Sequence, residues 1–128
     1  MRTTSFAVVL TLLVLAGCGG GDKKADTSPE GVVKTTILDW MFKQDKCPYM
    51  TDKFLEAQAF IGETRAARCD FLKKTYRPPG YSKDAVKFRK VVVSGPRATA
   101  VIGDDFSNVE ATYKLVKTGD RWLIDEAD

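Results

Sequence analysis

The stretch VVVSGPRATAVIGDDFSNVEATYKLVKTGDRWLIDEAD, residues 91–128, decides the fold of this chain. Runs of β-branched and aromatic residues alternate in it with short turns, and Gly119 is available for a left-handed turn position. Trp122 and Ile124 fall on one face of the last run. Extended back to residue 86, the pattern predicts an antiparallel meander of four strands, at 86–94, 98–103, 109–117 and 121–126.

The residues before this stretch predict helices. Ser28 is a suitable N-cap, Pro29 fits the first helical position and Glu30 places an acid in the first turn. This helix is expected to end near Gln44, and its apolar stripe consists of Val33, Ile37, Trp40 and Met41.

Two further helices are expected before the strands. The second starts after a cap at Thr51-Asp52 and carries Phe54, Leu55 and Ala59; the pattern leaves open whether Phe60 and Ile61 extend it up to Gly62. The third is expected at 63–75, with Ala66, Cys69 and Leu72 at spacing three. Helices first and strands afterwards predict an α+β fold, with the N-terminal helices packed on one face of an antiparallel sheet.

The N-terminus has the pattern of a cleavable export signal. A single charge at Arg2 precedes eleven residues, Phe6 to Ala16, that are almost all apolar. At about 1.5 Å per residue, this run is too short to cross a hydrocarbon core of roughly 30 Å. The next ten residues, GGGDKKADTS at 19–28, are Gly-rich and polar, as in a flexible tether.

Leu15-Ala16-Gly17-Cys18 resembles the lipobox of bacterial lipoproteins at all four positions. The resemblance implies that Cys18 is acylated and that the bond before it is cut. The expected divisions are a signal peptide at 1–17, a tether at 18–28 and a domain at 29–128. The protein would then be lipid-anchored outside the cytoplasm, at the cell membrane or the outer membrane. The alternative is an ordinary signal peptide that leaves Cys18 free or paired.

With Cys18 acylated, Cys47 and Cys69 remain as an even pair in an oxidising compartment. We expect a disulfide between them; the alternative is two buried free thiols.

Composition excludes several classes of function. The chain has no histidine, which excludes Ser-His-Asp and Cys-His nucleophile systems and makes a zinc site improbable. The net charge of +3, from 20 basic and 17 acidic residues, is too small to indicate nucleic-acid binding. Asp104-Asp105 and the acidic C-terminus lack the spacing of a Ca²⁺ loop. No cofactor, metal or catalytic motif is predicted.

The C-terminal half resembles the end of a nuclear transport factor 2-like domain. The resemblance rests on Gly95-Pro96-Arg97-Ala98, on the strand from Thr112 to Val116, and on Gly119-Asp120-Arg121-Trp122 followed by Ile124. It implies a strongly curved sheet that wraps the helices into a cone with a pocket inside. Members of this family include isomerases, dehydratases, polyketide cyclases and non-enzymatic binding or dimerising modules.

The residues considered for such a pocket are Asp39, Trp40, Tyr49 and Tyr113. A carboxylate at Asp39 in an apolar pocket could serve as a general base, whereas its position off the apolar stripe favours an exposed helix residue. Tyr113 alternates with Ala111 and Leu115 and is expected in the core or along a pocket.

Eight basic residues on the third helix and around the first strand could attract an anionic envelope surface, although a solvated charged face is the default interpretation. They are Arg65, Arg68, Lys73, Lys74, Lys83, Lys87, Arg89 and Lys90.

The function predicted is non-catalytic binding of a small ligand or a protein partner by a membrane-anchored domain. One alternative is an isomerase-, dehydratase- or cyclase-like enzyme with an Asp/Tyr pocket, and another is a homodimerising structural module.

Overall fold

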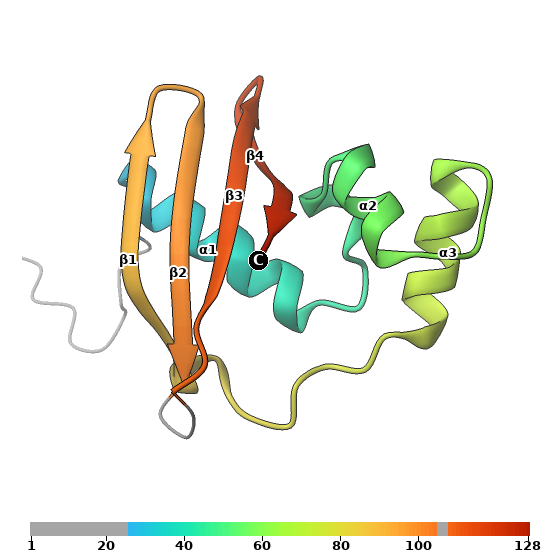
Figure 1. The fold of residues 1–128 in the computed structure, drawn as a ribbon, viewed down its shortest axis with the longest axis horizontal. Coiled ribbons are helices and arrows are strands. Elements are labelled where there is room, and N and C mark those ends of the chain that lie inside the picture. The colour runs from blue at the N-terminus through green and yellow to red at the C-terminus, as the bar shows by residue number, and fades with distance from the viewer. Residues whose placement is uncertain (1–25, 105–107) are drawn as a thin grey trace, which may run out of the picture.

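A computed structural model describes residues 26–104 and 108–128 of the chain. Three helices come first, and four strands follow in a single sheet (Figure 1). The helices are α1 (Pro29–Phe42), α2 (Asp52–Gln58) and α3 (Arg65–Thr75), and the strands are β1 (Val86–Ser94), β2 (Arg97–Asp104), β3 (Ala111–Thr118) and β4 (Arg121–Ala127). Short 3₁₀ turns at Cys47–Tyr49 and Lys83–Ala85 connect these elements. The predicted α+β class is confirmed.

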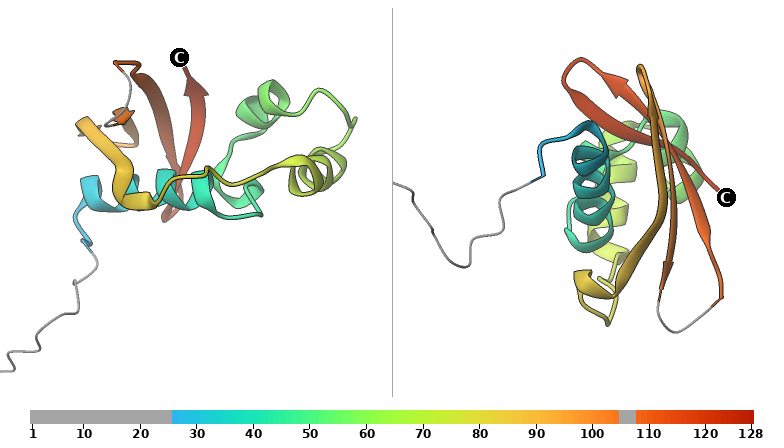
Figure 2. Two further views of the ribbon diagram at one scale, coloured as in Figure 1. Left: turned by 90° about the horizontal axis from the view of Figure 1, so that it is seen from below. Right: turned by 90° about the vertical axis from the view of Figure 1, so that its left-hand side faces the viewer.

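The sheet is an antiparallel meander in which each strand pairs with its neighbour in the chain, in the order β1-β2-β3-β4. Left-handed glycines close the hairpin turns, with φ of +56° at Gly95 and +60° at Gly119. Helix α1 lies across one face of the sheet, which we call the inner face (Figure 2). The opposite, outer face carries no helix in the described residues.

Helix α1 begins as the sequence predicts, with the Ser28 hydroxyl accepting a hydrogen bond from the Gly31 amide at 3.1 Å. Val33 and Ile37 of its apolar stripe are completely buried against the sheet, whereas Trp40 is partly exposed. The six largest fully buried side chains among the described residues are those of Val33, Ile37, Met50, Leu55, Leu115 and Ile124.

The residues before α2 close the β4 edge of the sheet. Met50 forms an isolated parallel bridge with Ile124, and the Thr51 amide donates to the Ile124 carbonyl at 3.0 Å. The Thr51 hydroxyl caps α2 by accepting from the Phe54 amide at 3.2 Å, and it donates to the Asp125 carboxylate at 2.8 Å. Helix α2 is thereby fixed beside β4.

Some predicted boundaries differ from the structure. Helix α1 ends at Phe42 and not near Gln44, and α3 starts at Arg65 because Thr64 caps it. Helix α2 ends at Gln58, so Phe60 and Ile61 lie in the loop that follows it. Part of the predicted turn at 104–108 lies outside the described residues. In the described ranges, no helix combines the length and the apolar composition needed to cross a bilayer.

Candidate functional site

A cavity of about 220 Å³ lies between the C-terminal end of α1 and the inner face of the sheet. Ile102 and Ala111 are partners across β2 and β3, and Tyr113 follows Ala111 on the same face of β3. Among the described residues, no Asp, Glu, Lys or Arg lines the cavity, so its walls suit an apolar ligand. The lining consists of Met41, Tyr81, Val86, Ile102, Gly103, Val109, Ala111 and Tyr113.

Of the four predicted pocket residues, Tyr113 lines this cavity, and Trp40 packs against Tyr113. The rings of Trp40 and Tyr113 pack edge to face with centroids 5.5 Å apart, and Trp40 also packs on Phe54 at 5.6 Å. Burial raises the pKa of the Tyr113 phenol, with a smaller contribution from Tyr81, so this phenol stays neutral at physiological pH. Tyr113 can therefore offer a hydroxyl group to a ligand.

The other two predicted residues, Asp39 and Tyr49, do not line the cavity and are linked to each other through Lys43. The Asp39 carboxylate lies 3.2 Å from the Lys43 amine and 3.9 Å from the Lys83 amine. The Lys43 amine also donates to the Tyr49 hydroxyl at 3.1 Å. Asp39 is not among the residues that line the cavity. The structure thus places no acid/base pair of Asp39 and Tyr113 in the cavity.

A buried lysine is the main feature that sequence reasoning missed. The Lys46 side chain is 6% exposed, and its amine donates to the Trp40 carbonyl at 2.6 Å. The same nitrogen lies 4.1 Å from the ring centroid of Trp40 and 3.5 Å from that of Tyr76. Burial lowers the pKa of Lys46 to about 8. Nothing around Lys46 in the sequence signals this, because Tyr76 is 30 positions away.

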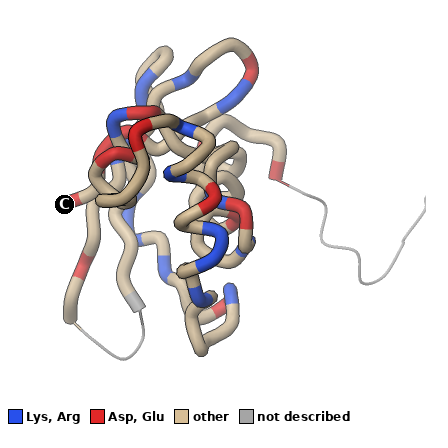
Figure 3. Tube along the Cα trace, turned by 90° about the vertical axis from the view of Figure 1, so that its right-hand side faces the viewer, with Lys and Arg blue, Asp and Glu red and all other residues tan. Residues whose placement is uncertain are grey.

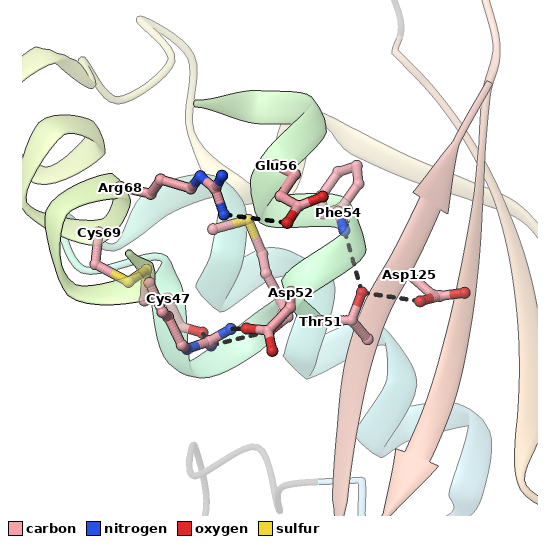
Figure 4. Close-up of polar contacts among 10 residues, drawn as sticks. Cys47, Thr51, Asp52, Phe54, Glu56, Arg68, Cys69 and Asp125 are labelled. Carbon is pink, nitrogen blue, oxygen red and sulfur yellow. Dashed lines mark hydrogen bonds and ion pairs between the residues drawn. A yellow bond between two sulfur atoms is a disulfide. The ribbon is translucent and has the colours of Figure 1, made fainter. Parts of the chain in front are cut away.

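The predicted disulfide between Cys47 and Cys69 is present, with the two Cα atoms 5.7 Å apart (Figure 4). It attaches a projecting unit, residues 52–75, which we call the helical arm and which comprises α2, α3 and the loop between them. Helix α3 has no buried residue of its own. Its half-buried Cys69, Phe71 and Leu72 pack against the core, and the disulfide and polar contacts strengthen this attachment.

Polar contacts hold both ends of α3. At its start, the Arg65 guanidinium donates to the carbonyls of Cys47 and Met50 at 2.7 and 3.1 Å. At its end, the Tyr76 hydroxyl donates to the Met41 carbonyl. All these partners lie between residues 41 and 50, so one short segment holds both ends of α3.

The basic residues do not form one surface. Those of α3 and those around β1 lie at opposite ends of the molecule (Figure 1). On the arm, Lys and Arg are interspersed with Asp and Glu (Figure 3). Arg65, Arg68 and Lys74 pair with Asp52, Glu56 and Asp70, respectively.

Cys18 and Asp105 lie outside the described residues. In residues 26–104 and 108–128, no group of three or more Cys, Asp and Glu side chains is placed to hold a metal ion. The chain matches no protein-family model, curated protein or solved structure, so its function has to be argued from its own residues and their geometry.

Proposed function

We propose that this chain is a lipid-anchored extracytoplasmic protein whose nuclear transport factor 2-like domain binds a small, mainly apolar ligand without catalysis. The observation that supports ligand binding is the cavity beside α1, whose lining side chains are uncharged and, apart from two phenol groups, apolar. A long helix across the inner face of an antiparallel sheet, with a cavity at one end, is compatible with the proposed cone.

Non-catalytic binding is favoured over the enzyme alternative because of where the carboxylate lies. An Asp/Tyr mechanism of proton transfer needs an acid or base within hydrogen-bond reach of the substrate. Asp39 instead pairs with Lys43 and Lys83 outside the cavity. Tyr113 alone, with a raised pKa, is a hydrogen-bond donor rather than a base at neutral pH.

The anchor is tested by replacing Cys18 with serine in the producing bacterium. The full chain is expected to fractionate with membranes and to carry acyl groups on an N-terminal Cys18 in mass spectra. Cys18→Ser should move almost entirely to the soluble extracytoplasmic fraction, because two or three acyl chains supply the membrane affinity. A Thr27→Ser variant in the same tether should stay membrane-bound. A wild-type chain whose N-terminal Cys18 carries no acyl groups in mass spectra would exclude the lipid anchor.

Ligand binding is tested by filling the cavity. Ala111→Phe places an aromatic ring in a space of about 220 Å³ and is expected to weaken binding of the neutral fluorescent probe N-phenylnaphthylamine at least about tenfold. Val101→Phe is the matched control, because Val101 points to the outer face between the buried Ala100 and Ile102. Equal affinities of the two variants would place the probe elsewhere.

A further inference from the structure

The loop between α2 and α3 exposes two adjacent large apolar side chains. Phe60 is 92% exposed and Ile61 is 62% exposed. Single exposed apolar residues are common on protein surfaces, but a neighbouring Phe-Ile pair at a loop is the kind of patch that marks an interaction site. We call Phe60 and Ile61 the arm tip.

The backbone keeps the arm tip turned outward. Gly62 follows it with φ of +116°, and a Cβ there would lie 2.9 Å from the Arg68 amide nitrogen. Only glycine fits this close, left-handed turn without strain. The arm tip is therefore followed by a turn with a defined backbone conformation.

The two helices on either side hold the loop. The Cys47–Cys69 disulfide fixes α3, and the Arg68 guanidinium lies 3.1 Å from the Glu56 carboxylate on α2 (Figure 4). The loop forms one end of the long axis of the molecule, remote from β1 (Figures 1 and 2). The arm tip is thus a stiff, convex apolar projection.

We propose that the arm tip inserts into the interfacial layer of the lipid bilayer to which the protein is anchored, and thereby orients the domain on that bilayer. This inference rests on the proposed anchor at Cys18. A convex tip of two apolar side chains suits a fluid layer, which closes around it, better than a rigid partner, which would need a matching hollow.

The start of α1 lies near β1, at the other end of the molecule from the arm (Figure 1), so the tether allows this contact when the domain lies along the bilayer. Residues 18–25 lie between the anchor position and the first described residue, and eight extended residues span at most about 29 Å. The anchor holds the domain at a high effective concentration next to the bilayer. A contact too weak to bind a free protein can therefore fix the orientation of an anchored one.

The charges around the tip indicate which lipids are needed. The arm cations Arg65, Arg68 and Lys74 are paired with carboxylates rather than free to bind anionic headgroups. Mixed charge covers this side of the molecule (Figure 3). Apolar insertion should therefore occur in neutral phosphatidylcholine and change little with salt.

The test holds the mature chain on phosphatidylcholine vesicles through an N-terminal histidine tag and a nickel-chelating lipid, in place of the acyl groups of Cys18. Phe60→Trp is compared with Val92→Trp, since Val92 is 47% exposed on β1, remote from the arm and outside the cavity lining. Native Trp40 and Trp122 also fluoresce, and this background emission is measured in the parent protein. Acyl-chain-brominated lipid is expected to quench the added emission of Phe60→Trp by roughly half and that of Val92→Trp little.

Each other result would overturn the inference. Equal quenching of the two variants would indicate non-specific contact with the bilayer. No quenching at Phe60→Trp would exclude insertion. If, in addition, the parent protein sediments as a dimer and Phe60→Ser does not, the arm tip would be assigned to contact with a second copy of the chain. Because the histidine tag replaces the natural anchor, a failed Cys18 experiment and a failed arm-tip experiment remain distinguishable.

Discussion

Reduction of the Cys47–Cys69 disulfide is expected to lower the free energy of unfolding by about 3 kcal/mol and to release α3 before the sheet unfolds. The bond joins residues 22 positions apart and restricts the unfolded chain. Its loss should act first on α3, whose apolar side chains are only half-buried against the core. For a domain of about 100 residues, the melting temperature should fall by about 10–20 °C.

This effect is measured by thermal unfolding and amide hydrogen exchange. The parent is Cys18→Ser, which removes thiol exchange with the third cysteine, and the variant adds Cys47→Ala and Cys69→Ala. Amides of α3 should exchange much faster in the variant, while those of β2 and β3 keep most of their protection. Equal loss of protection in α3 and in the central strands would show that the arm is not a separate unit of stability.

The stability of the fold is expected to increase between pH 8 and 10.5 because of Lys46. Burial lowers the pKa of Lys46 from 10.5 to about 8 in the folded chain. Below pH 8 the amine is protonated in both states, and its buried charge destabilises the fold. Between the two pKa values only the unfolded chain binds the proton, so stability rises with pH by up to about 3 kcal/mol. Above pH 10.5 the amine is neutral in both states.

The comparison needed is between the wild-type chain and Lys46→Met, by urea unfolding at both ends of this pH range. Met keeps the apolar stem of the side chain and removes the titrating amine. As the pH rises across this range, the free energy of unfolding of the wild type should therefore increase by the same amount relative to that of Lys46→Met. Lys43→Met is the control, because Lys43 is an exposed lysine near the same helix end. A difference that is constant with pH would show that the Lys46 amine does not lose its proton in the fold.

The sheet and the first helix could be predicted because their signals are local. A cap at Ser28 and apolar residues at helical spacing are sufficient to define α1. Alternation together with the turn at Gly119 similarly defines the β3–β4 hairpin. The disulfide could be predicted from the oxidising compartment expected for the chain and from the even number of cysteines that remain beside Cys18.

The site could be predicted only in part, because its contacts join residues far apart in the chain. Tyr113 lines the cavity as its strand position suggests, but the pairing of Asp39 with Lys83 depends on how the segment before β1 folds back to α1. Lys46 is buried because Trp40 and Tyr76 enclose it. Phe60 and Ile61 are exposed although their apolar character alone favours burial.

The bridge between Met50 and Ile124 has a consequence for the order of events during the proposed export. Each strand of the meander finds its partner within the next few residues, so the hairpins can form early and quickly. Met50 and Thr51, by contrast, contact residues 74 positions later, at the very end of the chain. A polypeptide that emerges N-terminus first has both Cys47 and Cys69 outside before Ile124 appears. We therefore expect the Cys47–Cys69 disulfide to form before the helical arm docks beside β4. The covalent link would then restrict the positions of α2 and α3 before they pack.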